Sequence, residues 1–187
     1  RQAKEQGLLH FGVSFSYQEV SDNVNFSVAG ELKTRESDLL LSTGNIEALS
    51  YQVSAAELAY QYSSALLQVE FLNTAVKQRQ NLEALRFSGY QLGLSYLLGG
   101  LDRSYKLKDG VFHAPNFKLS KKAYEFAFRL SKINLNDQDV QAGELQSVTV
   151  AFNWYISQLV KLACNFVRST KNKENEAKLE KDAFALR

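Results

Sequence analysis

The residues with the most scope for chemistry are the basic side chains between Gly99 and Lys122. This segment carries six cations against two anions, Asp102 and Asp109, a surplus of four charges in a chain whose total surplus is two. The cations are Arg103, Lys106, Lys108, Lys118, Lys121 and Lys122. Clustered cations concentrate anions, most strongly where a low-dielectric wall surrounds a narrow aqueous space. The segment predicts attraction of anions if it folds into or across such a space; the alternative is a solvated loop whose lysines contact nothing.

Other reactive side chains do not form a recognisable site in the sequence. His10 and His113 are far apart, with no carboxylate or cysteine at ligand spacing, so we expect no metal site and interpret a lone histidine as simply hydrated. Cys164 is the single cysteine and is interpreted as a small apolar filler. No Ser/His/Asp order, nucleophile elbow or glycine-rich phosphate loop occurs. We therefore predict that the protein is not an enzyme and uses no cofactor.

The elements that must position the charges are β-strands. Apolar and polar residues alternate with a period of two in segments near the roughly 9 to 11 residues that a tilted membrane strand needs. The predicted strands are Leu9 to Gln18, Val24 to Lys33, Glu57 to Tyr62, Leu67 to Phe71, Leu85 to Leu98, Tyr124 to Ile133, Val148 to Tyr155 and Val160 to Val167, with a ninth starting at Ala183.

The connections between these segments carry further expectations. A turn at Asp22-Asn23 predicts that the first two strands form a hairpin, followed by a polar loop from Thr34 to Asn45. The alternation slips near Ala55-Ala56, which predicts a β-bulge there. The charged stretch from Lys173 to Lys181 is interpreted as a solvated loop with helical tendency.

The two faces of the predicted strands differ in kind. One face is apolar and ends in tyrosine or tryptophan, whereas the other is rich in small and uncharged polar residues, such as Gly12, Ser14, Asn25, Gly93 and Thr149. An apolar face with aromatic ends is typical of the lipid side of an outer-membrane barrel, and strands can occupy a bilayer only as a closed barrel. The alternative is a soluble β-sandwich or lipocalin-like barrel in which the apolar stripes are buried. The net charge of +2 gives no general attraction to nucleic acid.

Specific residues add a family resemblance to this pattern. Leu85 to Asp137 and Gly143 to Val167 resemble the C-terminal half of the phosphate-selective porin O and P family, and the likeness extends from about Tyr51 onward. The matching pieces are Tyr96 leading into Gly100, Arg103 and Tyr105; Tyr124-Glu125-Phe126-Ala127 and Arg129, followed by Leu135-Asn136-Asp137; Gly143-Glu144 leading to Asn153-Trp154-Tyr155; Ala56-Glu57-Leu58-Ala59; and Ser63 to Glu70. Their order and spacing make the match more specific than any single piece.

The resemblance implies a sixteen-stranded barrel in the bacterial cell outer membrane, commonly a homotrimer, that conducts anions such as phosphate. Family members are much longer, so we expect residues 1–187 to form a single β-barrel domain that is a C-terminal part, lacking the N-terminal strands and the last residues. The loop that folds inward to narrow such pores would lie mostly in the absent half.

The lengths of the connections predict an orientation, because outer-membrane barrels have short periplasmic turns and longer outer loops. The turns at Ser63-Ser64 and Ile156 to Leu159 would be periplasmic. Alternation then puts the long segment from Gly99 to Lys122 at the same end. The predicted outer loops are Lys77 to Glu83, Asn134 to Leu145 and Thr170 to Asp182.

Charges on the predicted wall complete the candidate site. By alternation, Arg129, Lys161 and Lys33 face the lumen, as do four carboxylates: Glu31, Glu57, Glu70 and Glu125. Opposite charges there could produce a transverse field on permeating ions, or could neutralise each other between adjacent strands. Arg129 and Glu125 are about 13 Å apart along one strand, so their partners must come from adjacent strands.

The sequence therefore predicts a porin that passively conducts small hydrophilic solutes and prefers anions. Its expected partners are outer-membrane lipid and small anions. The alternative function is a structural barrel that docks an envelope partner complex, its pore being incidental.

Overall fold

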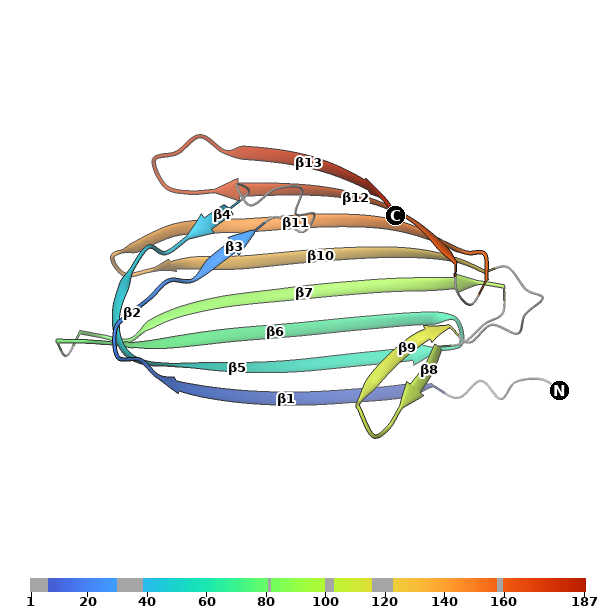
Figure 1. Cartoon of the computed structure of the whole chain (residues 1–187), viewed down its shortest axis with the longest axis horizontal. Coiled ribbons are helices and arrows are strands. Elements are labelled where there is room, and N and C mark those ends of the chain that lie inside the picture. The colour runs from blue at the N-terminus through green and yellow to red at the C-terminus, as the bar shows by residue number, and fades with distance from the viewer. Residues whose placement is uncertain (1–6, 30–38, 81, 100–102, 116–122, 158–159) are drawn as a thin grey trace.

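The computed structural model is an antiparallel β-structure, described for residues 7–29, 39–80, 82–99, 103–115, 123–157 and 160–187. Within these ranges, long strands form one curved sheet, with β1 and β13 at its edges (Figure 1). In sheet order they are β1 (Leu8–Glu19), β5 (Ile46–Tyr62), β6 (Ala65–Gln78), β7 (Leu85–Leu98), β10 (Ala123–Asp137), β11 (Val140–Tyr155), β12 (Lys161–Asn172) and β13 (Leu179–Leu186). The predicted all-β, antiparallel fold class is confirmed. A helix long and apolar enough to span a membrane is not found in the described ranges.

The apolar stripes of the strands lie on one exposed face. Pairing places Phe11, Leu58, Val69 and Leu92 side by side in one row across four strands, and each of these side chains is exposed. Since successive residues of a strand point to opposite faces, the small polar residues share the other face. We call these the outer and the inner face. A soluble sandwich would bury the apolar stripes, whereas in the described residues these stripes are exposed.

One row of residues in register across the outer face indicates that the strands are tilted. The row of Phe11 and Leu58 continues through Val148 and reaches Arg168 and Asp182 on β12 and β13, which form an ion pair at 2.7 Å. The same row is therefore apolar at one edge of the sheet and charged at the other. Strands inclined to a flat apolar layer produce this shift, and barrel closure requires such an inclination.

The connection between β1 and β5 folds over the inner face instead of forming a membrane strand. It contains β2 (Asn23–Val24), β3 (Ser27–Ala29) and β4 (Leu39–Ser42); β3 pairs with β4 and β2 pairs with β5 (Figure 1). The prediction of a long strand from Val24 to Lys33 in a hairpin with β1 was therefore wrong, because β5 is the partner of β1. We call residues 20–45 the apolar insert; residues 30–38 of it lie outside the described residues.

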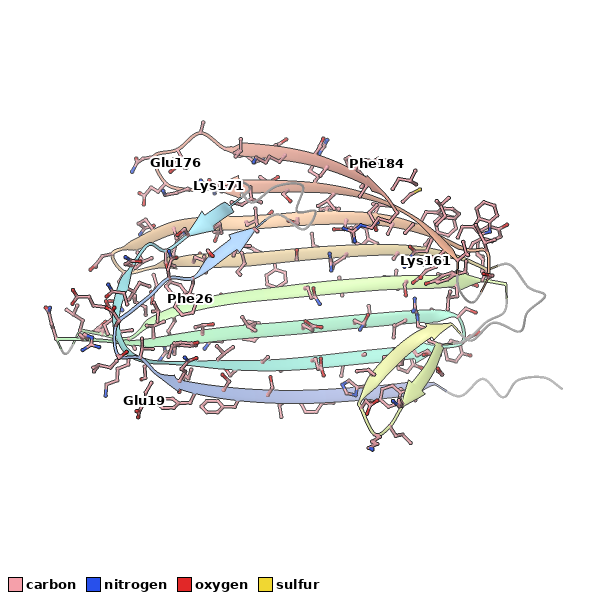
Figure 2. All side chains as sticks on the ribbon, viewed as in Figure 1. Glu19, Phe26, Lys161, Lys171, Glu176 and Phe184 are labelled. Atoms are coloured by element: carbon pink, nitrogen blue, oxygen red, sulfur yellow. The ribbon has the colours of Figure 1, made fainter. Side chains whose placement is uncertain are left out.

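A hydrophobic core joins the apolar insert to the sheet. Leu40 and Leu41 of β4 are buried in it, and Val24, Phe26 and Val28 pack against it. The wall contributes Ile46, Ala48, Val76, Leu85, Phe87, Leu135, Ala142 and Leu145. The ring of Phe26, labelled in Figure 2, lies 5.6 Å from Tyr51 and 5.7 Å from Phe87 between ring centroids. The alternation of Val24, Phe26 and Val28 therefore reflects burial against protein and not contact with lipid.

Of two other local predictions, one was wrong and one was correct only in part. The pairing of β5 is regular through Ala55-Ala56, and its irregularity lies between Ala48 and Ser50. The slip in the sequence arises because the apolar side chains change faces: towards the insert, β5 is polar on its outer face and contacts the apolar core on its inner face. The stretch from Lys173 to Lys181 begins as a solvated turn, as predicted, but it is not helical and enters β13 at Leu179.

The connections alternate between the two ends of the sheet as predicted. The tight turn after β5 lies at the end where the chain leaves β7 and β11, and the turns after β6, β10 and β12 lie at the opposite end (Figure 1). Ser63 and Gln138 adopt positive φ in two of these turns. The long connection between β7 and β10 holds the strands β8 (Arg103–Lys106) and β9 (Val111–Pro115), which form a separate hairpin.

Candidate functional site

The hairpin of β8 and β9 lies across the inner face of the sheet. We call its described residues, 103–115, the polar strap. Its turn reverses at Gly110, whose φ of 66° lies in the left-handed region that favours glycine. A Cβ at Gly110 would lie 3.6 Å from the ring of His10, so the turn sits close to the wall. The part of the basic segment from Arg103 to Pro115 therefore lies over the inner face.

Glu125 of β10 is the centre of the first anchor of the strap. Its side chain is 6% exposed and forms an ion pair with Arg103 of β8. It also accepts hydrogen bonds from Asn153 Nδ2 at 3.1 Å and from the Tyr155 hydroxyl at 2.7 Å. Arg103 additionally donates to Ser95 Oγ at 3.3 Å. A buried carboxylate is tolerable when it is paired and hydrogen-bonded in this way.

His10 of β1 is the centre of the second anchor. Its Nδ1 lies 2.6 Å from the hydroxyl of Tyr105 on β8, and its Nε2 lies 3.0 Å from Glu57 Oε1 on β5. A Cβ at Gly12 would lie 2.5 Å from that same carboxylate oxygen, so the glycine leaves room for Glu57 to reach His10. The expectation that His10 is simply hydrated was wrong, because its side chain is 15% exposed and contacts two elements.

Cavities on the inner face border the strap and the apolar insert. A cavity of about 370 Å³ is lined by Glu57, Glu70 and Glu125 and by the cationic Arg103, with Phe112 of the strap on one side. A second cavity, of about 250 Å³, lies against Val28 of the insert and also touches Glu70. Glu70 therefore borders both. The lining carboxylates place negative charge beside the strap.

The six predicted cations of the basic segment fall in different environments. Arg103 is half-buried beside Glu125, and Lys106 pairs with Asp109 at 2.5 Å, so neighbouring carboxylates compensate both charges. Lys108 is exposed at the turn of the strap. Lys118, Lys121 and Lys122 lie outside the described residues. The structure therefore brings Arg103 to the wall. Lys108 stays exposed at the turn of the described strap.

Two of the three predicted wall cations lie in the described residues, and both point to the inner face. Arg129 is exposed and lies in register with Gly93 and Thr149. Lys161 is exposed, with its Nζ 5.8 Å from the ring centroid of Tyr155. The sequence left two alternatives for the wall charges, a transverse field on permeating ions or neutralisation by neighbouring opposite charges. For Glu125 the second holds. Its cation comes from the strap, however, and not from an adjacent strand as predicted. Lys33 and Glu31 lie outside the described residues.

The sequence analysis did not identify His10 and Tyr105 as site residues. It placed Glu125 on the wall but did not predict that Glu125 anchors the polar strap. A signal for Glu125 was present: it is a carboxylate at an inner position between the aromatic residues Tyr124 and Phe126. The contact of Tyr105 with His10 links residues 95 positions apart, which no local pattern reveals. Among the described residues, no three His, Cys, Asp or Glu side chains are arranged to hold a metal ion.

Comparison with known proteins gives one family. The family model described as "Phosphate-selective porin O and P" matches residues 3–187. Porin O from Pseudomonas aeruginosa (strain PAO1) is 24% identical over 213 residues, which cover 96% of this chain and 48% of Porin O. The chain thus spans about half the length of the curated relative that it matches.

Proposed function

Because the chain belongs to the phosphate-selective porin O and P family, we propose that the complete protein is a passive channel for small hydrophilic solutes in the bacterial outer membrane, with a preference for anions. The observation that carries this proposal is the contrast between the faces of the sheet. The outer face exposes apolar rows such as Phe11, Leu58 and Val69, whereas the inner face is polar beneath the polar strap and is covered by the apolar insert where it is apolar. Such a sheet separates lipid from a narrowed aqueous space.

The proposed anion preference depends on cations along that space. Arg129, Lys161 and Lys108 supply it within the described residues, and Lys118, Lys121 and Lys122 would add to it. The carboxylates of Glu57 and Glu70 oppose it, so the preference is a balance between nearby charges of both signs. The described strands would form one part of a sixteen-stranded barrel, with the rest of the wall supplied by further strands, and the barrel would assemble as a trimer.

Planar-bilayer recording of the complete protein tests the proposal. We expect discrete conductance steps and, in a salt gradient, a reversal potential of the sign that anion permeation gives. The absence of steps would reject the channel and favour the structural barrel that docks a partner. A reversal potential of the opposite sign would reject the anion preference alone. Chemical cross-linking in detergent tests the trimer.

A pair of neighbouring substitutions on β7 tests the assignment of the faces. Leu92 lies on the outer face, and Gln91 lies on the inner face in register with Glu70. Leu92→Arg would place a charge in lipid and cost about 2 to 4 kcal/mol near the bilayer midplane. The Gln91→Arg variant should instead fold normally, and its reversal potential should shift further in the direction that anion permeation gives. Equal destabilisation by both would contradict the assignment.

A further inference from the structure

The polar strap crosses the inner face of several strands and is fastened at both of its sides. Towards one side, Arg103 contacts Glu125 of β10 and Ser95 of β7. Towards the other side, Tyr105 contacts His10 of β1. Between them, Gln61 of β5 donates from Nε2 to the backbone carbonyl of Arg103 at 3.1 Å. These contacts hold the strap against the inner face of the sheet, where Figure 1 shows β8 and β9 in front of β1 and β5.

Apolar packing contributes little to this attachment. Leu107 of the strap is 88% exposed and Val111 is 45% exposed. The buried apolar cluster at this end of the sheet consists of Leu97, Ala123 and Tyr155, all of them on the wall. The position of the strap therefore depends on its polar contacts.

Among these contacts, the one between Arg103 and Glu125 is the strongest. It joins two opposite charges whose side chains are 14% and 6% exposed, where a low dielectric strengthens their attraction. Arg103 also has an Nε atom that is buried without a hydrogen-bond partner among the described residues. Removing the carboxylate would leave this guanidinium without its anionic partner, and a buried charge left in this way is strongly unfavourable. The strap would then move so that Arg103 reaches water.

We propose that Glu125 is a positioning residue for permeation: it fixes the polar strap, through Arg103, at one place across the lumen and so sets the width of the passage. Asn153 and Tyr155 hold the carboxylate in place from β11. This inference rests on the proposed channel function. It assigns to Arg103 a different role from the other cations, because it positions the strap and does not attract permeating anions.

Glu125→Gln and Arg103→Gln test the proposal in single-channel recordings of the complete protein. We expect both to give excursions to a larger conductance, because the fraction of open time with the strap displaced should rise by roughly a hundredfold when the buried pair is broken. The double variant should give fewer excursions than either single variant, because it leaves no buried charge without a partner. An unchanged conductance in Arg103→Gln would overturn the proposal, because Glu125 would then act on the wall alone.

Hydrogen exchange of the segment 103–115 provides a readout that does not need conduction. The amides of Asp109 and Gly110 donate to the Lys106 carbonyl, so loosening of the strap should accelerate their exchange in Glu125→Gln. Arg168→Gln is the matched control, since it breaks an arginine–carboxylate pair on the outer face and should leave both readouts unchanged. Faster exchange in a protein without conductance would reject the channel but retain the positioning role. Unchanged exchange would overturn the role itself.

Discussion

The two segments that cover the inner face are attached by opposite kinds of interaction. The apolar insert is held by a hydrophobic core, in which Leu41 is 2% and Phe87 is 3% exposed. The polar strap is held by an ion pair and hydrogen bonds centred on Glu125 and His10. The inner face of the sheet is therefore apolar where it contacts the insert, near one end, and polar where it contacts the strap, near the other end.

The difference bears on how each segment responds to change. Hydrophobic attachment is non-directional and spread over many side chains, so it does not depend on any one hydrogen bond or ion pair. Polar attachment depends on a few directed contacts, and the loss of one partner leaves another polar group unsatisfied. The apolar insert should therefore act mainly on the stability of the protein. The polar strap should act mainly on conduction, and the following substitutions test this division.

Phe87→Ala should have the largest effect on stability. Phe87 is buried in the core beneath the apolar insert and contacts the ring of Phe26. Truncating a buried phenylalanine costs about 3 to 5 kcal/mol through lost burial and a residual cavity. Equilibrium unfolding in urea with the refolded protein in lipid measures this loss.

Phe126→Ala is the control for that prediction, because Phe126 is 51% exposed on the outer face. Lipid chains can fill the space left there, so no cavity should remain and the cost should be clearly smaller. Equal costs at the two positions would show that the core beneath the insert contributes no more than the lipid-facing surface.

Gly143→Ala should have the next largest effect, and it acts beside the apolar insert and not on the polar strap. Gly143 has a φ of 101°, and an added Cβ would lie 2.9 Å from the Asn172 carbonyl and 3.2 Å from Leu41 Cδ2. Backbone strain of this kind costs about 1 to 3 kcal/mol. We expect a lower thermal midpoint and faster proteolysis of residues 20–45, with normal conductance fluctuations. Gly93→Ala is the control, because its Cβ would approach nothing closer than 3.9 Å. Enlarged fluctuations in Gly143→Ala would contradict the division between insert and strap.

The sequence predicted the strands better than the segments between them. Alternation located β1, β7 and β10 because each keeps one apolar face exposed over its middle part. The same signal failed for Val24, Phe26 and Val28, because a period of two reports which side is apolar and not whether lipid or protein covers it. For the site, the sequence found Arg103 as a cation but not its partner. For Glu125 the sequence predicted a partner on an adjacent strand, whereas its partner Arg103 lies on the hairpin of β8 and β9, a position that no periodicity predicts.

Tyr105→Phe should have a smaller effect, confined to the strap. It removes the hydroxyl that lies 2.6 Å from His10 Nδ1 and keeps the ring contact with Phe112, whose centroid is 4.8 Å away. The loss of one hydrogen bond costs about 0.5 to 1.5 kcal/mol, less than the loss of a buried charge partner. Conductance excursions should therefore be rarer than in Glu125→Gln but still above the wild-type frequency. The control is Tyr51→Phe, which removes the hydrogen bond to Gln18 outside the strap. Fluctuations equal to those of Glu125→Gln would show that His10 is the principal anchor.

An exposed ion-pair cluster outside the membrane-spanning part should give the smallest effect. Glu176, in the turn between β12 and β13, pairs with Lys173 at 2.7 Å and with Lys171 at 2.9 Å (Figure 2). Hydrogen bonds from Lys173 and then Lys171 lower the pKa of Glu176 from 4.5 to about 2. A lowered pKa stabilises the folded protein above pH 4.5, and this contribution is lost as the pH falls through 2. Because the cluster is exposed, salt should weaken it, whereas the buried contact of Glu125 should be screened much less. NMR titration of the Glu176 carboxyl checks the pKa, and Lys173→Gln should raise it towards 4.5. If salt loosened the strap as readily as it raised the pKa of Glu176, burial of the Glu125 contact would not explain the firmer attachment.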